Sequence, residues 1–366
     1  MFARCSSLFA CALTLSAALS TPATAAPRKL LYVATPGVRD YLEYGGHGIL
    51  VFDIEDHHKF LKRIPSAGLD KDGKPLNVKG ICANEKTGRL YVSTTQSLMS
   101  FDLETEKMLW EKKYEGGCDR MAITPDGRTI YLPSLEKEHW HAIDAISGDV
   151  IKKIVLNSGA HNTIVGPDGR YAYLAGLKSP LLRVVDTSNN EVAREIGPFG
   201  NVIRPFTIDG RQTRCYVNVN ELLGFEIGDL KNGKVLARVE IAGFEKGPPK
   251  RHGCPSHGIA LTVDGSELWV TDAYNNRMHI YDTASLPPKK LGDIRLRDQP
   301  GWITFSIDGK LAYPSTGDVI DVKTRKIIAE LTDEKGTAVQ SEKLLEIDMD
   351  GTKAFKAGNQ FGLSAP

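Results

Sequence analysis

A repeat of roughly 42 residues limits the fold of this chain more than any other feature of its sequence. Each copy contains a short apolar strand, a turn that ends in glycine, a second apolar strand and a third strand with an acidic residue, as in "MAITPDGRTIYLPS" and "IALTVDGSELWVTD". Asp-Gly between two alternating apolar strands predicts a hairpin, because glycine accepts the positive φ that the turn needs. The turn glycines are Gly88, Gly127, Gly169, Gly210, Gly265, Gly309 and Gly351.

Third strands recur seven times, so they predict seven blades. Their acidic residues are Asp53, Asp102, Asp144, Asp186, Glu226, Asp282 and Asp321. Segments such as "KIVLNS" supply a fourth strand, and four antiparallel strands at this period are typical of a propeller blade. The N-terminal copy lacks a first strand, whereas "KLLEIDMDGTKAFKAG" near the C-terminus has a first-strand, turn and second-strand pattern without a third strand. We therefore expect an all-β, seven-bladed β-propeller of four-stranded antiparallel blades, closed by the N- and C-terminal strands so that no sheet edge stays open.

Residues 1–26 are expected to form a cleaved secretory signal, because Arg4 precedes an apolar run from Leu8 to Leu19 that ends in small residues. The protein is then periplasmic or secreted, and residues 27–366 form one propeller domain. No later segment approaches the roughly 18 continuous apolar residues of a membrane span, so we expect none. The 46 basic and 45 acidic residues give a formal net charge of +1, which argues against nucleic acid as a partner.

Four cysteines lie beyond this signal segment. Cys82 and Cys215 occur in apolar, strand-like segments, where we expect buried free thiols. Cys118 and Cys254 lie next to turns, and their disulfide state is left open. Four scattered cysteines do not form a disulfide framework, although an exported protein can form disulfides.

Several copies, among them "GRYAYLAG" and "SELWVTDAYNNRMHIYDT", resemble the YVTN-type β-propeller repeat over nearly all of the mature chain. That resemblance places the chain near YncE-like propellers, propeller lactonases and the haem propeller of cd-type nitrite reductases. Tyr-Val is followed here by Ser93-Thr94 or by Asn218-Val219 in place of Thr-Asn, and blade 5 is irregular. The repeat implies a fold and says little about function.

Propeller geometry sorts the polar residues by face. If the first strand of each blade lines the channel, the loops that lead into these strands lie together at one mouth of the channel, and functional groups are expected there. Aligning the blades on their turn glycines places Asp119, His161 and His257 in register. The predicted ligand-binding residues are Lys79, Arg120, His161, Asn162, Arg204, His257 and Trp302. The long segment 243–256 also leads to this face.

Three functions compete for this site, and the cofactor remains unknown at this stage. A metal or haem site would use His252, Cys254 and His257 from the H-x-C-x-x-H sequence, since imidazole and thiolate suit copper, zinc or iron. His161 and Cys118 are candidates for a further ligand from another blade. Only one ligand cluster is present, and the simpler interpretation is a loop of turn-forming dipeptides.

A lactonase-like hydrolase is the second alternative. In it Arg120 and Arg204 would hold a carboxylate, His161 or His257 would act as general acid or base, and Asp119 would orient the imidazole. The simpler interpretation of these residues is a set of charges that pair with one another in a wet channel.

The third function, which we favour from the sequence, is a non-catalytic module that binds a small molecule or a protein at the channel mouth. Exposed aromatic residues of the loops would anchor such a partner. The candidates are Tyr41, Tyr44, Trp140 and Tyr274. Trp110, Trp269 and Trp302 fall at strand positions that suggest packing between blades.

Overall fold

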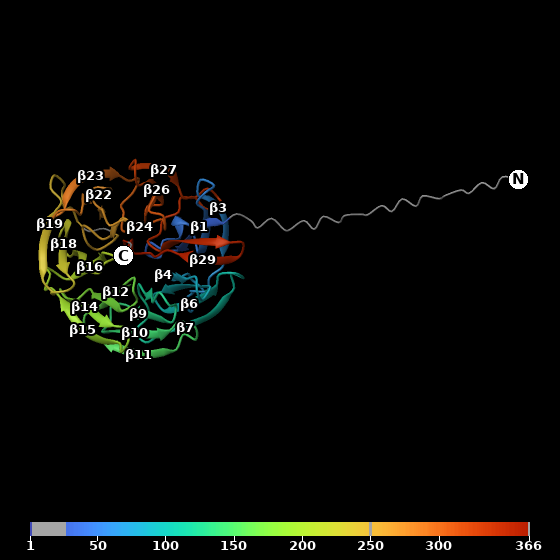
Figure 1. Cartoon of the computed structure of the whole chain (residues 1–366), viewed down its shortest axis with the longest axis horizontal. Coiled ribbons are helices and arrows are strands. Elements are labelled where there is room, and N and C mark those ends of the chain that lie inside the picture. The colour runs from blue at the N-terminus through green and yellow to red at the C-terminus, as the bar shows by residue number, and fades with distance from the viewer. Residues whose placement is uncertain (2–26, 249–250, 365–366) are drawn as a thin grey trace.

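The structure is a computed structural model that describes Met1, residues 27–248 and residues 251–364. The expected signal segment, apart from Met1, lies outside the described residues. Seven antiparallel sheets are arranged radially around one axis, which confirms the predicted seven-bladed β-propeller (Figure 1). Among the described residues, no helix has the length and apolarity needed to cross a membrane.

Each blade runs from an inner strand at the channel to an outer strand at the rim. Blade 1 contains β28 (Leu344–Asp350), β1 (Arg28–Thr35), β2 (Gly48–Asp53) and β3 (Lys59–Ile64), and blade 2 contains β4 (Val78–Asn84), β5 (Arg89–Thr94), β6 (Ser97–Asp102) and β7 (Met108–Lys113). Blade 3 contains β8 (Ala122–Ile123), β9 (Thr129–Pro133), β10 (His139–Asp144) and β11 (Val150–Val155), and blade 4 contains β12 (Ala160–Val165), β13 (Tyr171–Gly176), β14 (Leu182–Asp186) and β15 (Glu191–Ile196). Blades 5 to 7 contain β16 (Ile203–Ile208), β17 (Arg214–Val219), β18 (Gly224–Asp229) and β19 (Val235–Glu240); β20 (Ile259–Leu261), β21 (Glu267–Asp272), β22 (Arg277–Asp282) and β23 (Lys289–Arg295); β24 (Ile303–Phe305), β25 (Leu311–Pro314), β26 (Asp318–Asp321) and β27 (Lys326–Glu330).

The hydrophobic core lies between neighbouring blades, because the middle strands are buried on both faces. Trp269 of blade 6 packs edge-on against Phe305 of blade 7, with ring centroids 5.4 Å apart. Trp140 of blade 3 is fully buried, and its indole donates a hydrogen bond to Thr163 of blade 4 at 2.9 Å. Trp140 is therefore a core residue, and the interpretation of its side chain as a surface anchor is wrong.

Strands from both ends of the chain share blade 1, as predicted. β1 pairs with β28, so the C-terminal part supplies the inner strand that the N-terminal part lacks. β29 (Lys353–Ala357) was expected to be the second strand of its repeat. It instead pairs with the edge of β28 that faces away from β1, which makes blade 1 five-stranded. The following segment, residues 358–364, continues toward the centre of the ring (Figure 1).

Blade 5 contains a correction to the predicted repeat. The acidic residue that ends its third strand is Asp229, which pairs with Arg214 as Asp282 pairs with Glu267 in blade 6. Its side chain accepts the backbone N–H groups of Lys231 and Asn232 at the turn, at 2.8 Å each. Glu226, which the sequence suggested for this position, instead lies in mid-strand, where it is buried. Turn chemistry, not the presence of an acidic residue alone, marks the end of the strand.

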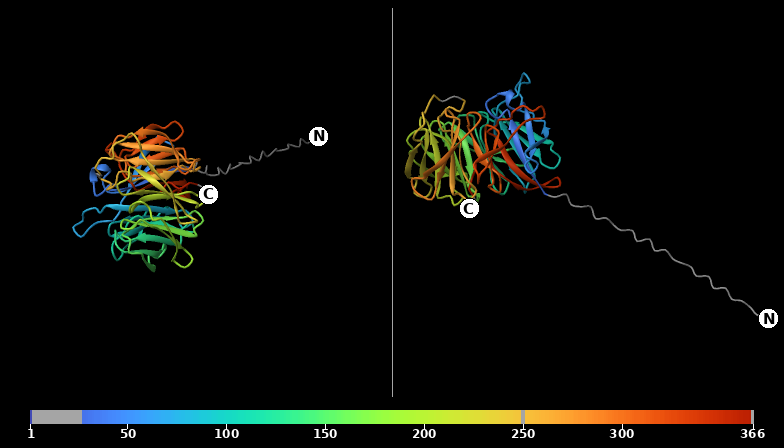
Figure 2. Two further views of the ribbon diagram at one scale, coloured as in Figure 1. Left: turned by 90° about the vertical axis from the view of Figure 1, so that its left-hand side faces the viewer. Right: turned by 90° about the horizontal axis from the view of Figure 1, so that it is seen from above.

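The two faces of the disc differ in what they carry. The loops that precede the inner strands lie on one face, which we call the mouth, and the glycine turns that follow the inner strands lie on the other, which we call the turn face. Figure 2 shows the C-terminal end of the chain on the side away from the protruding loops. At the turns, Gly127 and Gly265 have φ values of 75° and 70°, as the hairpin prediction requires.

Candidate functional site at the channel mouth

A small polar cavity of about 130 Å³ lies at the mouth, where the inner strands of all blades begin. Its lining includes five of the seven predicted ligand-binding residues, namely Lys79, Arg120, His161, Arg204 and His257. Each precedes or begins an inner strand of a different blade, from blade 2 to blade 6. The structure therefore brings together residues that lie up to 178 positions apart in the sequence.

Arg120 is the centre of a buried hydrogen-bond network below the cavity. Its guanidinium donates to Glu342 at 2.7 Å and to Asn162 at 3.2 Å. The same guanidinium lies 3.7 Å above the ring of Trp302, a cation–π contact. Arg120 and Trp302 are each only 2% exposed. Asn162 and Trp302 thus support Arg120 from below and are not part of the cavity lining.

His161 and Asp119 form a buried pair on the wall of the cavity. The Nδ1–H of His161 donates to Asp119 Oδ2 at 2.7 Å, which leaves the buried Nε2 of the imidazole without a partner. Lys79 Nζ lies 3.3 Å from the other carboxylate oxygen. Burial alone would raise the pKa of Asp119, but the hydrogen bond from His161 and the charges of Lys79 and Arg120 lower it below its ordinary value. Burial lowers the pKa of His161, so this imidazole is neutral and its Nε2 is a basic nitrogen.

His257 and His252 lie side by side, with ring centroids 5.6 Å apart. His257 donates through Nδ1 to the carbonyl of Gly301 at 2.7 Å, and burial lowers its pKa well below the ordinary value. His252 donates through Nδ1 to Glu342 at 2.8 Å, and its Nε2 is buried without a partner. Both imidazoles are thus anchored through Nδ1.

Cys254 does not belong to this histidine group. Its buried thiol donates to the carbonyl of Ser256 at 3.0 Å, and burial raises its pKa to about 12. The third residue beside His252 and His257 is Glu342, whose potential ligand atom lies within 4.8 Å of theirs. Cys82, Cys118, Cys215 and Cys254 are all buried and free, so the structure contains no disulfide among the described residues.

Blade 1 contributes two residues that the sequence analysis missed, Glu342 and Lys343. Glu342 accepts hydrogen bonds from Arg120, His252 and Lys343 at 2.7–2.8 Å. Burial opposes its ionisation, but the charge of Lys343, the hydrogen bond from His252 and the charge of Arg120 lower its pKa well below the ordinary value. Burial lowers the pKa of Lys343 to about 7. The alignment on turn glycines could have found Lys343, since it precedes Gly351 by the same eight positions that separate His257 from Gly265.

Positive charge dominates the lining of the cavity. Among the residues that the structure describes, six basic side chains line it, from Arg39, Lys79, Arg120, Arg204, Arg251 and Lys343, against the two acidic side chains of Glu136 and Glu342. Two further carboxylates pair with the basic residues from behind, Asp119 with Lys79 and Asp298 with Arg251. Basic residues in this described part of the site still outnumber acidic ones by two, which favours an anion in the cavity.

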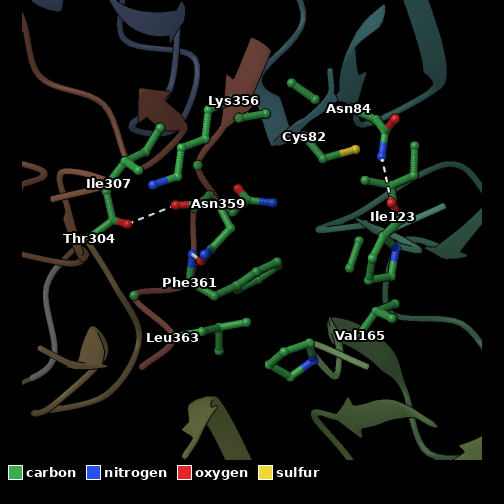
Figure 3. Close-up of a pocket in the computed structure, with 18 of the residues that line it drawn as sticks. Cys82, Asn84, Ile123, Val165, Thr304, Ile307, Lys356, Asn359, Phe361 and Leu363 are labelled. Carbon is green, nitrogen blue, oxygen red and sulfur yellow. Dashed lines mark hydrogen bonds between the residues drawn. The ribbon is translucent and has the colours of Figure 1, made fainter. Parts of the chain in front are cut away.

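A second, larger cavity of about 470 Å³ opens at the turn face, and one of its walls is the C-terminal segment 358–364 (Figure 3). Figure 3 shows Asn359, Phe361 and Leu363 across the cavity from Cys82 and Val165. The side chain of Gln360 bonds to Met121 and Ile81, and its backbone carbonyl accepts the indole N–H of Trp302. Gly362 accepts hydrogen bonds from Thr207 and Leu261 at 3.2 and 2.9 Å. This segment therefore closes the channel below the mouth network.

Fold and site together define a seven-bladed β-propeller with a small, basic cavity at one end of its channel. Comparison with protein-family profiles gives no match, and comparison with curated proteins gives none either. The chain is similar to the solved structure of the dihydro-heme d1 dehydrogenase NirN in complex with DHE, at 14% identity and a TM-score of 0.61, over 90% of this chain and 73% of NirN. It is also similar to the β-propeller domain of Myceliophteria thermophila Cps50 (Swd1), at 11% identity and a TM-score of 0.59, over 76% of this chain and 94% of that one. These similarities concern the β-propeller fold.

Proposed function

We propose that this chain is an exported, YVTN-type β-propeller that binds a small anion, most simply a compound with a carboxylate group, at the channel mouth without transforming it. The observation that carries this proposal is the excess of basic over acidic side chains around one cavity. Guanidinium groups match the planar carboxylate, and the neutral imidazoles of His161 and His257 add polar contacts for the rest of the ligand.

The size of the cavity limits the ligand. A volume of about 130 Å³ lies well below the roughly 300–1,000 Å³ of pockets that hold drug-sized molecules. A carboxylate with a few further heavy atoms suits this space, whereas a cofactor of many rings does not.

Haem fits neither cavity, although a haem protein was one of the alternatives. The mouth cavity is too small for the macrocycle. The larger cavity at the turn face has no histidine in its lining among the described residues, and its one thiol, on Cys82, is buried. A metal ion at His252, His257 and Glu342 would meet Arg120 and Lys343, which already neutralise that carboxylate.

Calorimetric titration of the full chain with oxalate, malonate, lactate and phosphate tests the proposal. At least one of these anions should bind with a stoichiometry of one, and Arg204→Gln should weaken that binding at least about tenfold, because a charge-assisted hydrogen bond is lost. Arg211→Gln is the matched control, because Arg211 is an exposed residue of the turn face. The proposal fails if none of the probes binds or if the two variants behave alike.

A hydrolase remains the second candidate because of one specific observation, the Asp119–His161 pair. A carboxylate that fixes the imidazole tautomer and a free Nε2 facing a cavity are the parts of a general base. Such a base would take a proton from water as the water oxygen attacks a lactone carbonyl, and the ring C–O bond would break to give the hydroxy acid. Assays with small lactones separate the two functions. Hydrolysis that His161→Gln abolishes would replace the binding proposal with the hydrolase.

A further inference from the structure

A second group of metal-compatible side chains lies apart from the mouth cavity, where blade 2 connects to blade 3. It consists of Glu115, His139 and His141, whose potential ligand atoms all lie within 4.8 Å of one another. His139 and His141 are two positions apart on β10, so their side chains share one face of the strand, opposite Trp140. The two imidazole rings meet edge to face with centroids 4.7 Å apart.

The hydrogen bonds of the two histidines leave lone pairs free. His139 donates through Nε2 to the backbone carbonyl of Glu115 at 3.1 Å, so its Nδ1 carries the lone pair. An imidazole N–H anchored on a carbonyl is the usual arrangement behind a metal-bound histidine. The Nδ1 of His141 is buried and has no hydrogen-bond partner. The two residues are only 5% and 3% exposed, so little solvent reaches their imidazoles.

Glu115 completes the group and gives it access to solvent. Its side chain is exposed, and both of its carboxylate oxygens accept hydrogen bonds from Lys153 at 2.8 Å. Lys153 lies on β11 directly opposite His141, and its side chain is 39% exposed. The ammonium group can therefore move into solvent when a cation takes its place. This differs from the mouth, where Arg120 and Lys343 are buried beside Glu342.

We propose that Glu115, His139 and His141 bind one divalent transition-metal ion, with Zn²⁺, Co²⁺ and Ni²⁺ as suitable ions. Two imidazoles and one carboxylate are a frequent ligand set for these metals, and water fills the remaining coordination positions. In this site Lys153 occupies the cation position when no metal is present.

Calorimetric titration of the full chain, without a polyhistidine tag, with ZnCl₂ and CoCl₂ tests this site. The wild type should bind one equivalent, and Co²⁺ should produce visible d–d absorption bands. His141→Asn should weaken binding by about 100-fold or more, since a direct ligand matters at least as much as its supporting partners. Glu115→Gln should weaken it by about tenfold. Lys153→Gln should strengthen binding, by up to about fivefold, because it removes an exposed ion pair that competes with the metal.

His252→Gln is the matched control, because His252 belongs to the other metal-compatible group at the mouth. It should leave the stoichiometry and affinity unchanged. Loss of binding in His252→Gln with retention in His141→Asn would overturn the proposal, as would a wild type that binds no Zn²⁺. Lys153→Gln does not remove a ligand, so it tests the site even if the histidine variant fails to fold, and unchanged affinity in it would contradict the role given to Lys153.

Discussion

The two ends of the channel are built from the same seven inner strands, yet they differ in chemistry. The mouth is small, basic and lined by residues from the loops that precede the strands. The turn face has the larger cavity, and residues 358–364 close it with backbone hydrogen bonds and apolar side chains. In this propeller the charged side chains of the channel therefore gather where the inner strands begin, and the structural contacts lie where the C-terminal segment passes.

Two buried glutamates four positions apart, Glu342 and Glu346, show how the neighbouring charges differ along the channel. Glu342, just before β28, is surrounded by Arg120, His252 and Lys343, which lower its pKa in spite of burial. Glu346, within β28, is buried too, but its neighbours include Asp348 and Asp308, and its pKa rises to about 8. Burial has the same direction at both sites, so the neighbouring charges decide which carboxyl group is ionised.

Removing the charge of Glu342 should have the largest effect on stability. Glu342→Gln keeps the shape of the side chain but leaves the buried Arg120 and Lys343 without their counter-charge. We expect the free energy of unfolding in urea to fall by about 3 kcal/mol or more, as for other broken buried ion pairs. Glu334→Gln, which affects the exposed pair with Arg63, should cause little change. A loss below about 1 kcal/mol in Glu342→Gln would mean that the network is solvated.

The closing segment at the turn face should contribute nearly as much through packing. Phe361 is 4% exposed and packs edge-on against Trp302. Phe361→Ala should lower the free energy of unfolding by about 3 kcal/mol, whereas Phe355→Ala, at a side chain that is 51% exposed, should cost much less. Equal losses in the two variants would show that residues 358–364 do not pack as a wall of the channel.

Stability should also depend on pH through Glu346. The ordinary pKa of a glutamate is about 4.3, so between about pH 5 and pH 8 the unfolded chain has lost this proton while the folded protein still holds it. The folded protein then binds more protons, and its stability falls as the pH rises through this window. Glu346→Gln removes this term, so the variant should be more stable than the wild type by roughly 2 kcal/mol at pH 6, with the two converging near pH 4.5. Chemical unfolding at both pH values measures this, and parallel pH profiles would contradict the raised pKa.

The sequence predicted the fold well because turn chemistry and strand alternation repeat in every blade. It also placed Lys79, His161 and His257 at one mouth, since a closed ring forces equivalent positions of different blades together. Glu342 and Lys343 were missed because they precede the inner strand of blade 1, which comes from the C-terminal part of the chain. In the sequence this strand is not followed by the third strand that marks the other repeats. The inner position of β29 could not be predicted, since its pattern matches that of an ordinary second strand.

Side-chain partners were the other limit of the sequence. Cys254 stands in an H-x-C-x-x-H motif, but local loop geometry directs its thiol to Ser256 and leaves Glu342, from a distant blade, beside the histidines. The grouping of Glu115 with His139 and His141 likewise depends on how the loop from blade 2 contacts blade 3. Such contacts follow from three-dimensional packing, which a motif along the chain does not contain.

The smallest expected effect concerns the pH dependence of anion binding at the mouth. Burial lowers the pKa of Lys343 to about 7, so this ammonium group loses its charge between about pH 6 and pH 8 while Arg120 and Arg204 stay charged. Affinity for oxalate, whose own charge is constant in this range, should therefore fall by a few-fold as the pH rises. Lys343→Met should bind more weakly at pH 6 and should lose most of this dependence, as measured by calorimetric titration at three pH values. An unchanged slope in Lys343→Met would assign the pH dependence to another group of the mouth.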